Sequence, residues 1–138
     1  MLCEIMNTST PCQPIVLLVD DYPSGLLVST MMIEHLGYTV VALSSGKEVI
    51  EKVRSSTEPF MAIMMDVNMG DMDGFEATKI IREIEQEKGY SNTIIAVTAH
   101  ALLGDRERCL EAGMNDYISK PIHPDILKQK LIELANKS

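Results

Sequence analysis

The stretch FMAIMMD, residues 60–66, decides the fold class. Its first six residues are all apolar, and the run ends at Asp66. A strand that is apolar on both faces is typical of a parallel sheet with helices packed on both sides. Because the run is short and follows the breaker sequence STEP (56–59), it is predicted to be a buried strand rather than a helix.

Outward from this run, strand and helix patterns alternate along the chain. Four further strands are predicted, at IVLLV (15–19), YTVVAL (38–43), TIIAV (93–97) and DYIS (116–119). Helices are predicted at about residues 24–36, from Ser45, from Asp73, at about 104–112 and from Pro124. This alternation predicts a doubly wound α/β domain with a parallel, flavodoxin-like sheet of strand order 2-1-3-4-5.

Individual helices carry recognisable start signals. Ser45 with Glu48 matches a capping box, and Asp73 with Glu76 is suited to cap the third helix. In the first helix, apolar residues recur four apart and define the predicted apolar side. The two adjoining rows of that helix are Leu27–Met31 and Val28–Met32–Leu36.

The chain has 138 residues and a mass of 15.3 kDa, which suits one well-buried domain. Residues 1–13 are polar and aperiodic and are predicted to be a flexible tail, so the domain is assigned to residues 14–138. With 20 Asp and Glu against 12 Lys and Arg, the formal charge is −8 and no local run is basic. A nucleic-acid partner is therefore not expected.

The number of cysteines and the length of the apolar stretches indicate the cellular compartment. The three cysteines, Cys3, Cys12 and Cys109, are odd in number and lack metal-ligand spacing. No apolar stretch approaches roughly 18 residues, and the N-terminus has no secretory signal. The chain is therefore expected to be a cytoplasmic domain without membrane contact.

In a doubly wound sheet, ligands bind beyond the carboxyl ends of the strands. The residues at these ends are Asp20 and Asp21, then Asp66, Thr98 and Lys120. Carboxylates that converge repel one another and need a cation, and all-oxygen ligands favour Mg²⁺. A metal, a lysine and a hydroxyl around one carboxylate are suited to hold a phosphoryl group.

Each of these residues also has a structural explanation when taken alone. Asp20 and Asp21 can end a strand and cap a helix, Asp66 can be a turn residue, and Lys120 can be an exposed lysine before Pro121. Only their joint placement at consecutive strand ends favours a functional site. A calcium loop starting at Asp66 is excluded because its sixth and twelfth positions are not Gly and Glu.

The chain resembles the receiver domain of two-component signalling over residues 15–136, and most closely those of hybrid sensor histidine kinases. The matching stretches are VLLVDDYPSG (16–25), MMDVNMGDMDGFEATKIIRE (64–83) and AVTAHALLGDRERCLEAGMNDYISKPI (96–122). The resemblance implies that Asp66 is the phosphoacceptor and that Mg²⁺ is the cofactor. It assigns the metal site to Asp20, Asp21, Asp66 and the carbonyl of Asn68.

The resemblance also implies how the phosphoryl group is held and sensed. Its oxygens are expected to contact Lys120, the Thr98 hydroxyl and the amides of Asn68 and Ala99. Tyr117 matches the aromatic switch residue that follows Thr98. The family further implies a cis Lys120–Pro121 bond, and side chains at Asn68 and His100 that tune dephosphorylation.

The implied donor is a histidine kinase or a histidine phosphotransfer protein, and the implied effector face lies near the fourth helix and fifth strand. Two alternatives stay open: a phosphorylation-independent interaction module, and the receiver segment of a larger hybrid histidine kinase. Whether the parent chain is itself an enzyme, and its oligomeric state, are open at this point. Two residues depart from the family pattern: Gly70 stands where Pro is usual, and Gly25 where hybrid-type receivers often have Asn.

Overall fold

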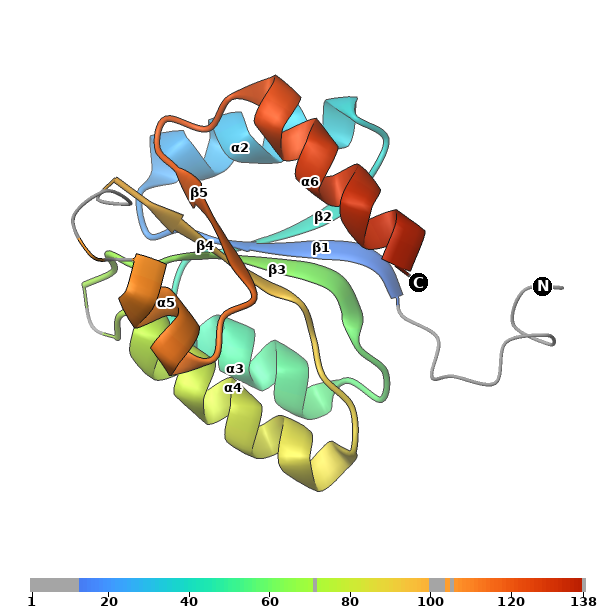
Figure 1. Ribbon diagram of the computed structural model, residues 1–138, viewed down its shortest axis with the longest axis vertical. Helices are drawn as coiled ribbons and strands as arrows, with labels where there is room; N and C mark the ends of the chain where they lie inside the picture. Colours follow the sequence, from blue (N-terminus) through green and yellow to red (C-terminus); the bar gives the residue numbers. More distant parts are fainter. Residues whose placement is uncertain (1–12, 71, 100–103, 105, 138) are drawn as a thin grey trace, which may run out of the picture.

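The computed structural model describes residues 13–70, 72–99, 104 and 106–137 of the chain. Within these residues, five strands alternate with five helices (Figure 1). The strands are β1 (Gln13–Val19), β2 (Thr39–Leu43), β3 (Phe60–Asp66), β4 (Ile94–Thr98) and β5 (Asp116–Ser119). The helices are α2 (Pro23–His35), α3 (Gly46–Ser55), α4 (Gly74–Lys88), α5 (Arg106–Ala112) and α6 (Pro124–Lys137). Apart from Gln13, the predicted N-terminal tail lies outside the described residues.

The strands form one parallel sheet in the order β2-β1-β3-β4-β5. This confirms the predicted α/β class and strand order. From β1 the chain adds β2 on one side of the sheet and then β3, β4 and β5 on the other side. The strand order therefore switches between the neighbouring strands β1 and β3. In folds of this kind, the crevice at that switch point is where ligands bind. The ends of β1 and β3 are therefore the first place to look for a site.

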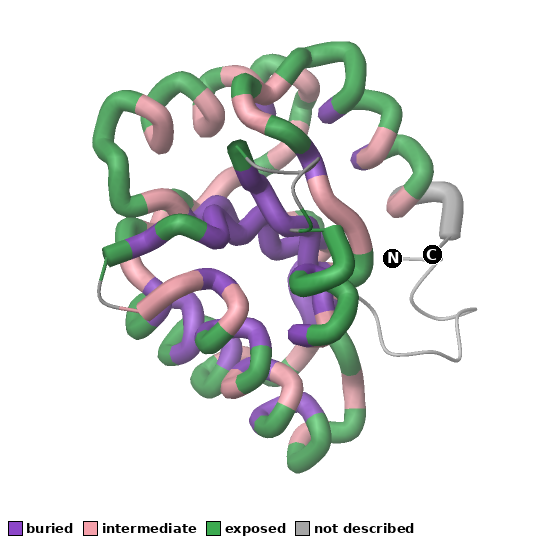
Figure 2. Tube along the Cα trace, turned by 60° about the vertical axis from the view of Figure 1, so that its left-hand side comes forward, coloured by how far each residue is buried: buried purple, intermediate pink, exposed green. Residues whose placement is uncertain are grey.

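Helices cover both faces of the sheet (Figure 1). On each face, side chains of the strands and of the covering helices form a hydrophobic core. Because alternate strand residues point to opposite faces, Leu17 and Met65 join the core shared with α3, α4 and α5. Val16 and Met64 join the core shared with α2 and α6. Figure 2 shows the buried residues concentrated in the middle of the molecule. The methionines of β3 thus fill the core, as predicted from their apolar setting.

The predicted helix starts are present. The amide of Glu76 donates to Asp73 Oδ1 at 2.9 Å, and the amide of Glu48 donates to Ser45 Oγ at 3.2 Å. The Glu48 carboxylate, however, accepts its 2.7 Å hydrogen bonds from the hydroxyl and amide of Ser44, one residue before the predicted cap. These hydrogen bonds, with the Ser44 hydroxyl first, lower the pKa of Glu48 below its ordinary value.

Helix α2 turns much of its apolar side toward solvent. Leu27, Val28 and Met31 are 61%, 57% and 60% exposed, and Tyr22 just before the helix is 65% exposed. Only Ile33 of α2 is fully buried. Apolar residues occur on nearly every side of this helix, so their spacing did not identify the buried side. We call Tyr22, Leu27, Val28 and Met31 the α2 apolar surface.

None of the described helices is both long and apolar enough to cross a membrane.

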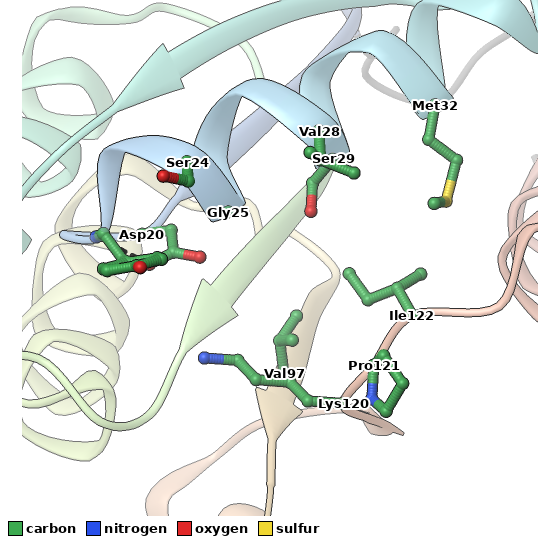
Figure 3. Close-up of a pocket in the computed structure, with 11 residues that line it drawn as sticks. Asp20, Ser24, Gly25, Val28, Ser29, Met32, Val97, Lys120, Pro121 and Ile122 are labelled. Atoms are coloured by element: carbon green, nitrogen blue, oxygen red, sulfur yellow. Dashed lines mark hydrogen bonds between the residues drawn. The ribbon is translucent and has the colours of Figure 1, made fainter.

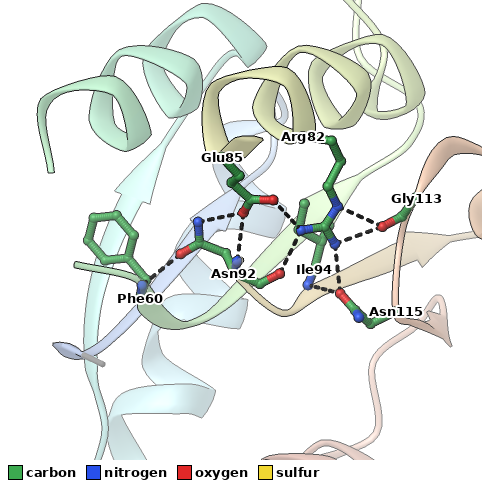
Figure 4. A network of polar contacts seen from close by, with 7 residues as sticks. All are labelled: Phe60, Arg82, Glu85, Asn92, Ile94, Gly113 and Asn115. Atoms are coloured by element: carbon green, nitrogen blue, oxygen red, sulfur yellow. Dashed lines mark hydrogen bonds and ion pairs between the residues drawn. The ribbon is translucent and has the colours of Figure 1, made fainter. Parts of the chain in front are cut away.

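A polar network ties α4 to the loops that precede β4 and β5 (Figure 4). The Arg82 guanidinium donates to the Gly113 carbonyl at 2.7 and 2.9 Å and to Asn115 Oδ1 at 2.8 Å. It also lies 2.6 Å from the Glu85 carboxylate, and it donates to the Asn92 carbonyl at 2.8 Å. Glu85 is only 4% exposed. The pair therefore joins α4 to the loop at Asn92 and to the more distant segment 113–115.

The same network reaches the first residues of two central strands. Asn92 Oδ1 accepts the amide of Phe60 at 2.7 Å, and Asn115 Oδ1 accepts the amide of Ile94 at 2.8 Å. The amino ends of β3 and β4 are thus fixed by side chains. The opposite, carboxyl ends of these strands carry the residues predicted to form a site.

Replacing Glu85 by Ala is expected to lower the free energy of unfolding by about 3 kcal/mol, because Arg82 would lose its buried charge partner. The exposed Glu51–Arg54 pair of α3 offers a matched control with the same i,i+3 spacing. Glu51→Ala is expected to change stability by less than about 0.5 kcal/mol. Urea denaturation of both variants measures the difference. Equal effects would show that the buried network does not stabilise the fold.

Candidate functional site

Three carboxylates meet at the carboxyl ends of β1 and β3. Asp20 and Asp21 follow β1 directly, and Asp66 is the last residue of β3. One oxygen from each carboxylate lies within 4.8 Å of the others. Three negative oxygens this close repel one another unless a cation is bound among them. Because the donors are all oxygen, they suit a hard divalent cation such as Mg²⁺.

Asp66 is the buried member of the cluster, with 2% of its surface exposed. Its Oδ2 lies 3.1 Å from Lys120 Nζ, and its Oδ1 accepts the amide of Asn68 at 3.0 Å. Burial raises the pKa of Asp66 above its ordinary value of 3.8, and the charge of Asp20 adds to the rise. The Asn68 amide and the Lys120 ammonium oppose it. The carboxylate is thus held in place by two groups that favour its charged form.

The two carboxylates after β1 are each held by a backbone amide. Asp20 Oδ1 accepts the amide of Tyr22 at 2.9 Å, within its own loop. Asp21 Oδ2 accepts the amide of Gly70 at 2.9 Å, from the loop that follows β3. The second bond connects two loops that are 49 residues apart in the sequence. The acidic cluster is therefore oriented from both sides of the switch point.

Lys120 and Thr98 complete the group predicted at the strand ends. Lys120 follows β5, and its amide donates to the Thr98 carbonyl at 2.8 Å, which joins the ends of β5 and β4. The Lys120–Pro121 bond is cis, as the family resemblance implied. Thr98 is fully buried, whereas Ala99, the next residue, is exposed. His100 lies outside the described residues.

Tyr117 lies on β5 beside the strand that ends in Thr98. Its register partner on β4 is Ala96, two residues before Thr98, so both side chains share one face of the sheet. The ring is half-buried against the core on the α5 side. The Arg106 guanidinium of α5 lies 6.0 Å from the ring centroid. Tyr117 thus shares a face of the sheet with Thr98 and lies beside Arg106 of α5, and its role as a switch residue stays a prediction.

An open pocket lies next to the acidic cluster (Figure 3). It has a volume of about 600 Å³ and separates α2 from the loop that begins at Lys120. Val28 and Met32 line it from α2, Ile122 lines it from the loop, and Asp20 and Lys120 lie at its polar end. The pocket therefore connects the α2 apolar surface to the charged residues.

Close packing behind the site depends on a residue that the sequence analysis did not single out. A Cβ on Gly74 would lie 2.6 Å from the Asp66 carbonyl oxygen and 2.9 Å from Val67 Cα. Glycine is needed there because the start of α4 rests directly on the end of β3. The Asp-Gly pair at the start of this predicted helix is the signal that would have identified it. The amides of Tyr22 and Gly70 carried no signal, because every residue except proline has the same backbone N–H group.

Comparisons with known proteins agree with this geometry. The family model described as the response regulator receiver domain matches residues 16–132. The chain is 40% identical over 131 residues to the sensor histidine kinase GacS of Pseudomonas protegens, covering 94% of this chain. It spans only 14% of the length of that relative.

Solved structures show the same likeness. The receiver domain of sensor histidine kinase PA1611 from Pseudomonas aeruginosa, which has a magnesium ion coordinated in its active site cleft, is 38% identical with a TM-score of 0.79. The match covers 91% of this chain and 99% of that one. The Ssk1 receiver domain of Saccharomyces cerevisiae, in a complex with the histidine phosphotransfer protein Ypd1, is 25% identical with a TM-score of 0.80. That match covers 92% of this chain and 91% of the other.

Replacing Asp66 by Asn is expected to raise the free energy of unfolding at pH 7 in the presence of EDTA. Because the pKa of Asp66 is raised in the folded protein, ionising it costs folding free energy at pH values above the unfolded pKa. The gain in the variant is therefore largest above the folded pKa, and it shrinks as the pH falls toward 3.8.

Urea denaturation between pH 7 and pH 4 measures this difference. Glu87→Gln, at an exposed position of α4, controls for the loss of one negative charge. A variant less stable than wild type at pH 7 would show that the contacts with Lys120 and Asn68 outweigh the burial of the carboxylate.

Proposed function

The chain belongs to the response regulator receiver domain family, and on that premise we propose that it accepts a phosphoryl group on Asp66 from a phosphohistidine. The observation that carries the proposal is the position of Asp66. Its carboxylate is buried beside Lys120 at 3.1 Å and within reach of two further carboxylates. A nucleophile, a cation and a metal site thus meet at one point.

The residues of this site have separable roles in the proposed transfer. An Asp66 oxygen attacks the phosphorus, and the bond from phosphorus to the histidine nitrogen breaks as the new bond forms. Lys120, already paired with Asp66, offsets the negative charge on the phosphoryl oxygens. The Thr98 hydroxyl and the amides of Asn68 and Ala99 are the remaining donors near the product.

The cofactor we propose is Mg²⁺, held by Asp20, Asp21 and Asp66 with the carbonyl of Asn68. Three oxygens within 4.8 Å suit a small divalent cation, and a related receiver carries magnesium in its active site cleft. When bound, the ion supplies positive charge that brings the acidic cluster and an anionic phosphoryl group together.

We propose that the phosphohistidine donor docks on the α2 apolar surface. The surface adjoins the pocket that leads to Asp20 and Lys120, so a partner seated there would bring its histidine to the charged end. Exposed apolar residues next to a concave site are typical of protein interfaces. A receiver of the same fold forms a complex with a histidine phosphotransfer protein. A histidine kinase or such a phosphotransfer protein is therefore the proposed donor.

The proposed output runs through Thr98 and Tyr117 to the fourth helix, α5, and the strand β5. Phosphorylation adds charge next to Thr98 and biases a two-state equilibrium. Tyr117 shares a face of the sheet with Thr98 and packs toward α5. A downstream effector is proposed to read this α5–β5 face.

The context of the domain follows from its relatives. Because the chain spans 14% of the length of its GacS relative, we propose that it acts as the receiver segment of a hybrid histidine kinase or as a receiver that serves one, in the cytoplasm. A phosphorylation-independent interaction module is the alternative. The joint presence of Asp66, Lys120 and the acidic pair favours the phosphoacceptor.

Incubation with acetyl phosphate and Mg²⁺, followed by intact-mass spectrometry, tests the phosphoacceptor role. We expect the wild type to gain one phosphoryl group only when Mg²⁺ is present, and Asp66→Asn to gain none. A wild type that is modified by neither acetyl phosphate nor a phosphohistidine donor would contradict the proposal and favour the interaction module.

The docking surface has its own test. Leu27→Asn with Met31→Gln is expected to slow transfer from a phosphorylated histidine phosphotransfer protein at least about tenfold, because interface anchors are lost. Modification by acetyl phosphate, which needs no docking, is expected to change less than about twofold in the same variant. Leu110→Gln, at another exposed apolar position, on α5, is the control. Unchanged transfer in the double variant would place the donor elsewhere.

A further inference from the structure

One loop supplies a backbone amide to each of two carboxylates of the site. Between β3 and α4, the amide of Asn68 donates to Asp66 at 3.0 Å, and the amide of Gly70 donates to Asp21 at 2.9 Å. The first bond stays within one turn of the chain. The second crosses the switch point from the β3 side to the β1 side. The loop therefore fixes carboxylates that belong to different strands.

The residue identity at position 70 matters for this second bond. A proline, which is usual there in the family that the chain resembles, has no amide hydrogen and cannot donate. Nothing else in the described structure requires glycine. Gly70 is not among the glycines with positive φ, and a Cβ added to it would meet only Asp21 Oδ2, at an ordinary 3.7 Å. What distinguishes this position from a proline is the N–H group.

Asp21 depends on this donor for its orientation. Its side chain is exposed, and between described residues its carboxylate has no other hydrogen bond. Without a cation, repulsion from Asp20 and Asp66 drives this carboxylate away from the cluster. The Gly70 amide opposes that movement and leaves the second carboxylate oxygen available to a ligand.

We infer that Gly70 is a positioning residue, whose amide pre-orients Asp21 for the divalent cation. The inference rests on the proposed function, because it concerns the metal site of that function. Pre-orientation strengthens binding by reducing the conformational entropy that the exposed side chain loses when a cation binds. A proline at the same position would stiffen the loop but leave Asp21 without its donor.

Two substitutions separate the amide from the side chain. Gly70→Ala keeps the N–H group and adds a Cβ for which there is room, whereas Gly70→Pro removes the N–H group. Isothermal titration of each with Mg²⁺ is expected to give a dissociation constant about 3- to 10-fold higher for the proline variant than for the alanine variant. Equal or tighter binding by the proline variant would overturn the inference. A wild type that binds no Mg²⁺ would instead overturn the proposed function.

Hydrogen exchange of the Gly70 amide tests the same bond without any metal. In EDTA, Asp21→Ala is expected to speed exchange of this exposed amide about 3- to 10-fold, because its acceptor is gone. The amide of Gly37, which donates to the Glu34 carbonyl at 2.9 Å, is the control. An unchanged Gly70 rate in the Asp21 variant would show that the bond does not restrain Asp21 in solution, and would overturn the inference.

Discussion

The rest of this structure depends on one buried carboxylate, that of Asp66. It lies at the end of β3, a strand that is itself buried on both faces. Asp66 is the last residue of β3, and its side chain is almost fully buried. The residues before it in this strand contribute to both hydrophobic cores. An isolated buried charge is costly, so the fold must bring compensating groups to it. The Lys120 ammonium and the Asn68 amide are those groups. The topology, which brings the ends of β1, β3, β4 and β5 to one edge, makes them available.

The two ends of the sheet are stabilised in different ways. At the amino ends of β3 and β4, charged and amide side chains bond to one another and to strand amides, and the Arg82–Glu85 pair is satisfied entirely within the protein. At the carboxyl ends, the three carboxylates of the described cluster have one ion pair, between Asp66 and Lys120. The first arrangement is complete without a ligand, whereas the second is short of positive charge. The amino ends are therefore suited to hold the strands in place, and the carboxyl ends are suited to bind a cation.

Much of this arrangement was predictable because it follows from short sequence patterns. Apolar runs such as residues 60–65 identified the strands, and the polar residue after each run identified the site edge. The buried side of α2 was not predictable, because apolar residues occur around most of that helix. The roles of the Gly70 and Tyr22 amides were also hidden, since every non-proline residue has the same donor. Contacts between loops 49 residues apart become visible only when the fold brings them together.

The charge balance of the site links binding to switching. Among the described residues, the three carboxylates of the cluster and the Lys120 ammonium leave two negative charges in excess, and the repulsion between the carboxylates is present whenever no cation is bound. The repulsion makes the empty cluster unfavourable and so increases the free energy released when a divalent cation binds. A phosphoryl group on Asp66 would turn its carboxylate into an uncharged acyl linkage. The phosphoryl oxygens would then replace the carboxylate as the partner of Lys120 and draw donors such as Thr98 toward them. Thr98 and Tyr117 lie on the same face of neighbouring strands, and the proposed signal would pass along this face toward α5. Under the proposed function, phosphorylation would therefore act through the same charges that would hold the metal.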